Sequence, residues 1–495
     1  MAESRNGQRT EPWLDNLATK EGIEENKTRF WAKDPSRIVT EATIDSGTFV
    51  IGNGANVYES TILPALESAK REIILVTCFW AHSVSLERLS ATLVKLSIRH
   101  HLHENEPKLR IRLCFSSLSL TQKLFHTSSP SGYIYPPSRW QSLGLPSPDV
   151  LENLDLQVKS VFFRPFSVMH PKFVIVDRQR ALLPSCNLSW ESWLECCLPI
   201  SGPFVDTLVD FWQHTWGRND LPSLDSYDGQ SSYPTTLVSA PNSPKGYDGT
   251  VSTKPTNGSA TSSPVLVDRP SSRVKIVLLP SPHHRAPRFR PIIAFAPPPP
   301  TPLNVYLLYH ISNAINHIRL LTPNLTSPPV ISALLAALKR GVNVTLITNR
   351  RMMVLEQLLT AGTITEFCVW NLRRCWKKLL NSKGPSTFSA SMEEGRYPNP
   401  GALQVGYFIP NERYAKSHIK CTIVDEKVVV LGSGNMDRAS WYTSQELGIA
   451  LEGEDVVRDV WKRVERELDE GKMAGVEWLR SQGYGATRTS HIGGV

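Results

Sequence analysis

The chain has 495 residues, 41% of them hydrophobic, so it can bury large cores and is long enough for two domains or one large duplicated unit. This length excludes a small scaffold held together by disulfides. The formal net charge of +8 at pH 7 favours an anionic partner, but 54 basic against 46 acidic residues is a modest excess, and nucleic acid, anionic lipid and a merely solubilising surface all remain open.

The eight cysteines show no CxxC spacing, and several lie in apolar runs. They are interpreted as reduced, buried thiols, which favours a reducing compartment. The N-terminal residues contain no apolar stretch typical of a signal peptide, and no run of about 18 apolar residues occurs. The expected location is intracellular, either in the cytoplasm or at the periphery of a membrane.

The first half of the chain alternates between helical and strand-like patterns. Residues 1–35 are mostly polar without a regular pattern of apolar residues, and are predicted to be disordered. A first lobe is expected at 36–218. Within it, a helical pattern at 56–69 leads to an apolar strand at 71–80, and a second helix leads to a strand at 109–117.

The second half repeats this order after an unusual segment. Residues 219–272 are rich in Ser, Pro, Gly, Thr and Asn, a composition that predicts a disordered linker. A second lobe is expected at 273–480, with strands near 317–322 and 342–348, and a flexible tail at 481–495. The alternation predicts an α/β fold built by duplication.

Two segments 248 residues apart carry the same polar residues at the same offsets. The sequence is HPKFVIVDRQRALLPSCN from position 170 and HIKCTIVDEKVVVLGSGN from position 418. In each copy Lys follows His by 2 positions, Asp by 7 and Asn by 17. One such triplet would arise by chance in roughly a few per cent of chains this long, but two with a matching Asn would not. The shared residues are His170, Lys172, Asp177, Ser185 and Asn187, and His418, Lys420, Asp425, Ser433 and Asn435.

The residue types in these segments suit a phosphate. His and Lys two positions apart lie on one face of a strand, so two copies related by a twofold axis would bring two of each into one cleft. Ammonium groups repel metal cations but hold phosphate oxygens and the charge of a pentacovalent transition state. One neutral imidazole can attack phosphorus while the other, protonated, gives its proton to the leaving oxygen. The sequence therefore predicts phosphoryl chemistry without a metal.

Acidic residues are needed to hold each imidazole in one tautomer through its Nδ1–H. Glu195 and Glu446 each follow the histidine of their own half after the next strand, and are predicted to do this. Asp177 and Asp425 are the other candidates, but they stand roughly 23 Å from the histidine along an extended strand. They are predicted to cap the strand and its turn.

These residues resemble the phospholipase D superfamily, whose signature is HxKxxxxD followed by GSxN, usually present twice. The second copy, including residues 432–435 and 437–440, is similar to cardiolipin synthase-like members. The first copy has Pro184 where the family has Gly, which affects the turn geometry only. The resemblance covers residues 44–475 apart from the linker.

The resemblance implies duplicated α/β/α sandwich lobes that share one central active-site cleft. It further implies a phosphohistidine intermediate without a metal or other cofactor. By the same resemblance His170 is the nucleophile and His418 the general acid, while Lys172, Lys420 and the motif Ser and Asn residues face the phosphate. A monomer is expected.

The sequence leaves the substrate open. A phospholipid, hydrolysed or used for phosphatidyl transfer to an alcohol, is favoured by the second motif and by aromatic residues that could line a lipid entrance, namely Trp190, Trp193, Trp441 and Tyr442. A nuclease or DNA-end phosphodiesterase is the alternative, favoured by the basic run at 373–378, although tyrosyl-DNA phosphodiesterases have Asn at the places of Asp177 and Asp425. A catalytically silent binding protein is the third reading, and the complete set of two His, two Lys and two Asn argues against it.

Overall fold

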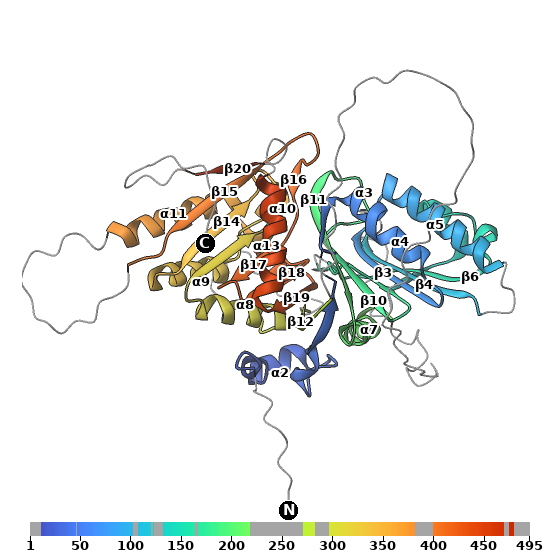
Figure 1. Cartoon of the computed structure of the whole chain (residues 1–495), viewed down its shortest axis with the longest axis horizontal. Helices are drawn as coiled ribbons and strands as arrows, with labels where there is room; N and C mark the ends of the chain where they lie inside the picture. Colours follow the sequence, from blue (N-terminus) through green and yellow to red (C-terminus); the bar gives the residue numbers. More distant parts are fainter. Residues whose placement is uncertain are drawn as a thin grey trace, which may run out of the picture.

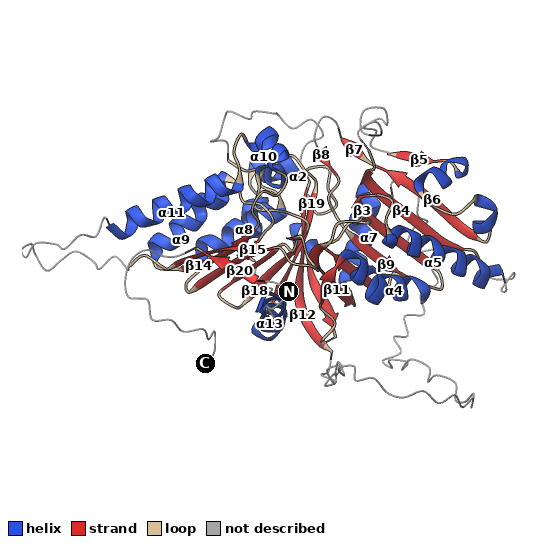
Figure 2. Cartoon of the chain, turned by 90° about the horizontal axis from the view of Figure 1, so that it is seen from above, coloured by secondary structure: helices blue, strands red, loops and turns tan. Residues whose placement is uncertain are grey.

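The computed structural model places two α/β lobes side by side (Figure 1). The residues that the structure describes are 11–45, 47–101, 107–119, 122, 132–163, 167–217, 271–282, 297–381, 399–469 and 475–479. Helices cover both faces of the strands in each lobe (Figure 2). The predicted fold class, two similar α/β lobes, is confirmed.

The strands of the first lobe pair in the order β5-β6-β4-β3-β9-β10-β11. Their bounds are β3 (Glu72–Phe79), β4 (Leu109–Ser117), β5 (Tyr133–Tyr135), β6 (Leu154–Ser160), β9 (Phe173–Val176), β10 (Arg180–Pro184) and β11 (Trp193–Ser201). The inner strands β3, β4 and β6 are parallel, and β3 and β4 are buried over almost their whole length, as expected for strands covered on both faces.

The second lobe repeats this order as β20-β15-β14-β13-β17-β18-β19. Its strands are β13 (His317–Leu321), β14 (Asn343–Thr348), β15 (Leu403–Ile409), β17 (Cys421–Val424), β18 (Val428–Gly432), β19 (Glu446–Glu452) and β20 (Gly475–Trp478). Strands β13, β14 and β15 are parallel, like their counterparts in the first lobe. The repeat seen in the sequence is therefore a repeat of the fold.

Two strands join the lobes into one sheet. Strand β1 (Val39–Ile44) pairs along its whole length with β12 (Ser272–Ser281), and its Thr43 also pairs with Ser201 of β11. Strand β12 in turn pairs with β19. The remaining short strands are β2 (Val50–Asn53), β7 (Phe162–Phe163), β8 (Ser167–Val168) and β16 (Lys416–Ser417). Of these, β16 runs parallel beside β11 and carries the chain directly to His418.

The helices bury an apolar stripe against the sheet, with exposed polar residues on the other side. In the first lobe they are α3 (Gly54–Val57), η2 (Tyr58–Ile62), α4 (Leu63–Glu67), α5 (Val84–His101) and α7 (Phe204–Thr215), with short 3-10 turns η3 (Pro137–Arg139), η4 (Gln141–Leu143) and η5 (Pro148–Leu151). In the second lobe they are α8 (Pro302–Asn313), α9 (Pro328–Arg340), α10 (Val354–Ala361), α11 (Thr365–Asn381), α12 (Arg438–Tyr442) and α13 (Glu454–Asp469). None of the described helices is long and apolar enough to cross a bilayer.

The N-terminal segment corrects one prediction. Residues 1–35 were expected to be disordered, but from residue 11 the chain forms α1 (Leu14–Leu17), α2 (Lys20–Asn26) and η1 (Pro35–Ile38). Trp13 and Trp31 are buried, and the Trp13 ring packs edge-on against Tyr306 at 5.0 Å between centroids. These two indoles anchor an otherwise polar segment to the lobe junction. Residues 1–10, the tail at 481–495 and all but the last two residues of the linker prediction lie outside the described residues.

Candidate active site

Each motif histidine stands where a short strand or bridge ends and a central strand begins. His170 follows β8 and precedes β9, and His418 follows β16 and precedes β17. The backbone N–H of His170 donates to the carbonyl of Gln445 at 2.8 Å, and that of His418 donates to the carbonyl of Leu194 at 2.8 Å. Each histidine is thus fixed to the strand of the opposite lobe, directly beside that lobe's glutamate.

The glutamates pair with the histidines across the lobe junction. The Nδ1 atom of His170 lies 2.7 Å from Oε2 of Glu446, and Nδ1 of His418 lies 2.9 Å from Oε1 of Glu195. The prediction that each glutamate serves the histidine of its own half is therefore wrong. The reason is geometric, because the backbone contacts described above bring the other lobe's carboxylate closest. A single site is built from both lobes.

The motif serines hold these glutamates. Ser185 Oγ donates to Oε2 of Glu195 at 2.5 Å and accepts from the N–H of Cys196 at 2.8 Å. Ser433 does the same for Glu446, with the N–H of Leu447 as its donor at 3.0 Å. The contacts correct the prediction that Ser185 and Ser433 face the phosphate, since each hydroxyl proton is directed at a carboxylate.

The two glutamates are held ionised. Burial would raise the pKa of each carboxyl, but the facing imidazole, the nearby lysine and the serine hydrogen bond together lower it below its usual value. An ionised carboxylate accepts the Nδ1–H of its histidine and leaves Nε2 free for chemistry. Ser440, which follows the second motif, donates a further hydrogen bond to Oε1 of Glu446 at 2.8 Å.

Burial lowers the pKa of both imidazoles, and the neighbouring lysines add to this effect against the opposing effect of the glutamates. The pKa of His418 falls to about 3. Both histidines are therefore neutral at pH 7 in the free site. The negative charge of a bound phosphate would raise both values, because it stabilises the imidazolium form.

The motif lysines lie in the same buried space. Lys172 Nζ donates to the carbonyl of His170 at 3.1 Å, and Lys420 Nζ donates to that of His418 at 2.7 Å. Each ammonium has further N–H groups to offer to an anion. Burial and the charge of Lys172 lower the pKa of Lys420 to about 7, despite the opposing charge of Glu195. A bound anion would therefore stabilise the charged form of Lys420.

The motif asparagines follow β10 and β18. Asn187 Oδ1 accepts from the N–H of Phe79, at the end of β3, at 3.3 Å. Asn435 Nδ2 donates to Asp437 at 2.9 Å, and its Oδ1 is buried without a hydrogen-bond partner among the described residues. The two amides are held differently in the two lobes.

The motif aspartates lie in the turns between β9 and β10 and between β17 and β18, both with left-handed backbone (φ 51° at each). Each carboxylate accepts three backbone N–H groups at the start of β3 or β13, those of residues 70–72 for Asp177 and of residues 315–317 for Asp425. These hydrogen bonds agree with the predicted capping role. Neither aspartate bonds to an active-site histidine.

The aromatic residues expected at a lipid entrance divide into two groups. Trp193 lies against the His418 ring at 4.8 Å between centroids, and Trp190 is 64% exposed. Trp441 is buried in the core, so its predicted place at an entrance is wrong. Tyr442 packs under the Arg438 guanidinium.

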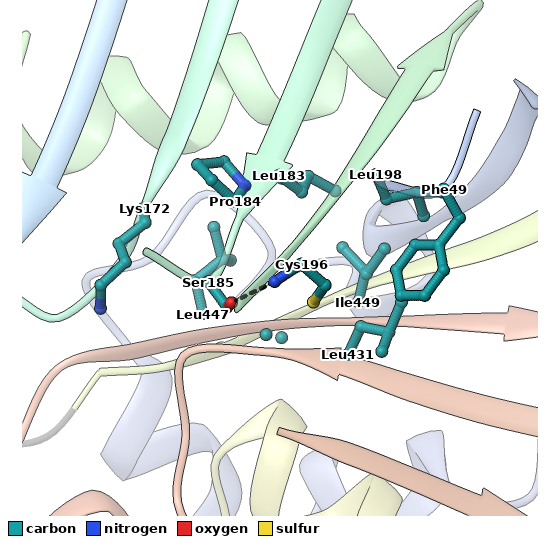
Figure 3. Close-up of a pocket in the computed structure, with 12 residues that line it drawn as sticks. Phe49, Lys172, Leu183, Pro184, Ser185, Cys196, Leu198, Leu431, Leu447 and Ile449 are labelled. Carbon is teal, nitrogen blue, oxygen red and sulfur yellow. Dashed lines mark hydrogen bonds between the residues drawn. The ribbon is translucent and has the colours of Figure 1, made fainter. Parts of the chain in front are cut away.

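Apolar pockets that the sequence did not reveal border both lysines. One lies between the strands of the two lobes, with Lys172 at one end and Phe49 at the other (Figure 3). The second, next to Lys420, is lined by α8 side chains including Leu303 and Leu307. Within the described residues, no three His, Cys, Asp or Glu side chains are grouped to hold a metal ion.

Comparisons with known proteins agree with this geometry. Residues 307–468 match a family model described as "Cardiolipin synthase, PLD-like domain". The solved structure of phosphatidylserine synthase from Haemophilus influenzae Rd KW20 is similar over 88% of this chain and 89% of its own, with a TM-score of 0.51 and 13% identity. The second lobe therefore carries a phospholipase D-like domain, and the chain as a whole has a fold similar to that of the synthase.

Two further solved structures of lower similarity were found. Nuc, a phospholipase D family member from Salmonella typhimurium, is 17% identical, with a TM-score of 0.27 over 42% of this chain and 98% of its own. Polyphosphate kinase from Porphyromonas gingivalis is 12% identical, with a TM-score of 0.42 over 85% of this chain and 50% of its own. A search of curated proteins gave no match. Superfamily members of this type are phosphodiesterases and phospholipid synthases, and the comparisons leave the individual reaction undetermined.

Proposed function

We propose that this protein belongs to the phospholipase D superfamily and acts on phospholipids, either hydrolysing them or transferring their phosphatidyl group to an alcohol. The observation that carries the proposal is the exchange of glutamates between the lobes, which brings two oriented imidazoles and two buried lysines into one site. The family match to a cardiolipin synthase domain and the fold similarity to a phosphatidylserine synthase support a lipid substrate.

In the proposed first step, Nε2 of His170 attacks phosphorus with its lone pair, and the bond from phosphorus to the leaving oxygen breaks. His418 gives that oxygen its proton. Lys172 and Lys420 hold the non-bridging oxygens, whose charge grows in the pentacovalent transition state. The phosphate itself supplies the charge that raises the pKa of His418, so that this imidazole acquires its proton when substrate binds.

In the second step, the now neutral His418 takes a proton from water or an alcohol. The resulting oxygen attacks phosphorus, and the bond from phosphorus to Nε2 of His170 breaks. Glu446 and Glu195 keep both rings in the required tautomer throughout. Water as the acceptor gives hydrolysis, and an alcohol gives phosphatidyl transfer.

The test is a turnover assay of the purified full chain on labelled phosphatidylcholine, phosphatidylglycerol and single-stranded DNA, with and without added glycerol. Release of head group or formation of a new phosphatidyl ester is expected, and both should disappear in His170→Ala. His101→Ala, which changes an exposed histidine at the end of α5, is the matched control. Turnover of DNA alone would instead favour the nuclease reading.

Excess EDTA should leave the activity unchanged. Two ammonium groups at the phosphate supply the positive charge that a metal would otherwise bring. Activity that is lost in EDTA and restored by Mg²⁺ or Zn²⁺ would refute the mechanism.

A further inference from the structure

Helix α10 turns its apolar side chains outward. Its buried residue is the polar Gln357, whereas Leu355, Leu358 and Leu359 are 72%, 49% and 60% exposed. A helix at the surface of a globular protein normally buries its apolar stripe. The three leucines of α10 therefore contribute little to the core of this chain.

The beginning of α11 extends this surface. Phe367 and Trp370 are 57% and 52% exposed, and their rings stack at 5.5 Å between centroids. Gln357 Oε1 accepts from both N–H and Oγ1 of Thr365 at 2.8 Å, so the start of α11 is held beside α10. We call this surface the apolar ridge. It comprises Met353, Leu355, Leu358, Leu359, Phe367 and Trp370. Exposed apolar groups gathered in this way mark contact with a membrane or a protein.

Positive charge accompanies the ridge. Residues 351–378 contain five basic side chains and two acidic ones, Glu356 and Glu366. The basic residues are Arg351, Arg373, Arg374, Lys377 and Lys378. The Arg374 guanidinium lies 5.4 Å from the centre of the Trp370 ring. Leucine and aromatic side chains beside cations fit the boundary between acyl chains and anionic head groups, where each finds its preferred surroundings.

The ridge is tied directly to the second catalytic motif. Gln357 Nε2 donates to Asn324 at 3.2 Å, and the N–H of Leu325 donates to Oγ1 of Thr365 at 3.0 Å. Leu325 also forms a β-bridge with Met436, the residue after Asn435. Helix α10 packs against α12, which follows this motif. A surface bound by the ridge would therefore lie near the active site.

We propose that the apolar ridge and its basic neighbours dock the protein on a bilayer that contains anionic phospholipid. The leucines and rings enter the head-group boundary, and Arg374 and Lys378 meet lipid phosphates. This inference rests on the proposed phospholipid substrate, because it explains how a protein with buried catalytic groups would be brought to a lipid surface.

The experiment measures binding of the full chain to vesicles of phosphatidylcholine with and without phosphatidylglycerol. The double variant Leu355→Gln/Leu359→Gln should weaken binding to the anionic vesicles at least about tenfold. Its matched control is Ile98→Gln/Ile134→Gln, which changes two side chains of the first lobe with 59% and 51% exposure. Equal binding by this ridge variant and wild type, or no vesicle binding by wild type, would overturn the inference.

A charge variant gives an independent readout if the leucine variant folds poorly. Loss of each basic group at an anionic surface weakens binding roughly fivefold, so Arg374→Glu/Lys378→Glu should lose more than that per site. The control is Lys95→Glu/Arg273→Glu, at two exposed positions away from the ridge. Loss of binding in the control as well as in the charge variant would contradict a specific surface.

Measurements of activity on dissolved lipid and on vesicles distinguish failure of this inference from failure of the proposed function. Both ridge variants should keep their activity on a short-chain lipid dissolved as monomers and lose it on vesicles. Ridge-dependent vesicle binding without turnover of any lipid would sustain the docking surface and refute the proposed reaction. Conversion of a dimer to a monomer in the leucine variant, at unchanged vesicle affinity, would show instead that a second copy of the chain covers the ridge.

Discussion

The two histidine motifs carry the same residues in different surroundings. In both, a histidine is paired with the opposite lobe's glutamate and a lysine donates to that histidine's carbonyl. The His170 side chain is 15% exposed, however, whereas that of His418 is 5% exposed and lies under the Trp193 ring. Duplication has preserved the reactive groups while the packing around them has diverged.

The strand ends beside the motifs differ as well. In the second lobe Gly432 and Gly448 face each other across β18 and β19, and Leu303 of α8 packs against Gly448. In the first lobe Pro184 and Cys197 hold the corresponding places. Position 55, which corresponds to Leu303, is an alanine. In the first lobe the strand side chains of Pro184 and Cys197 fill the space that Leu303 of α8 fills in the second lobe. The groups that surround the two histidines therefore differ.

The roles of His170 and His418 therefore depend on the residues that surround each histidine and not on the motif that they share. Two chemically identical histidines can act as nucleophile and acid only if their environments separate their proton affinities. Four experiments test how far the two copies differ.

The largest expected effect comes from the histidines. His170→Ala should reduce turnover of a natural phosphodiester at least about 10⁴-fold, because it removes the proposed nucleophile. His418→Ala should cost roughly 10²–10⁴-fold with an alkoxide leaving group. With a p-nitrophenyl phosphodiester, whose leaving group departs unprotonated, His418→Ala should still form a phosphohistidine on His170. Peptide mass spectrometry after a basic quench locates the adduct, and an adduct on His418 in His170→Ala would reverse the roles.

Substitution of each glutamate should have the kinetic effect of changing the histidine that it contacts, and not the histidine of its own half. Glu195→Gln should resemble His418→Ala, with a loss of roughly 10²-fold on an alkoxide substrate and little loss of the first step on the p-nitrophenyl ester. Glu446→Gln should slow both substrates, because it disturbs His170. The burst of p-nitrophenol distinguishes them. The opposite pattern would mean that each glutamate acts within its own half.

The sequence predicted the reactive groups because their spacing along a strand is local. It also predicted the aspartate caps, since a side chain seven residues from the histidine reaches the turn at the strand's end. It did not predict the exchange of glutamates, which joins residues 276 and 223 positions apart and depends on how β11 and β19 lie between the lobes. A short stretch of sequence does not show how strands from the two lobes align with each other.

Other features were missed for related reasons. The serines were assigned to the phosphate because their position beside the asparagines is local, whereas their glutamate contacts become visible only when the strand pairs. The polar N-terminal segment is anchored by Trp13 and Trp31, whose partners lie far along the chain. The ridge on α10 has ordinary helical spacing, and only the structure shows that its leucines point outward.

The pH dependence should reveal the lysine of the second motif. The pKa of Lys420 is about 7 in the free site, so kcat/KM should fall as pH rises through this value and the ammonium is lost. The fall in kcat should occur at higher pH, because bound phosphate stabilises the charged lysine. Unfolding at alkaline pH would also lower kcat/KM. Deprotonation of Lys420 does not cause such unfolding, because it makes the folded state more stable as pH rises.

A lysine with a pKa depressed below its unfolded value of about 10.4 binds fewer protons in the folded state, so its contribution to stability rises with pH between the two values. Urea unfolding at each pH therefore serves as the control. A kcat/KM that stays constant up to pH 9 would contradict the shifted Lys420.

The smallest expected effect concerns the strand ends, and it tests whether the two lobes are packed by different means. Gly432 has φ 155°, and a Cβ there would lie 2.4 Å from the carbonyl oxygen of Leu447. Gly432→Ala should lower the free energy of unfolding by about 2–4 kcal/mol, through a backbone clash in addition to strain. Gly453→Ala, at φ 138° with the nearest atom at 3.8 Å, is the matched control for strain alone and should cost less. Pro184→Ala should change stability by less than about 1 kcal/mol, because the first lobe does not depend on close strand approach there. Urea denaturation of the three variants decides the matter. Equal losses for Gly432→Ala and Gly453→Ala would mean that backbone strain, and not the close approach of β18 and β19, limits position 432.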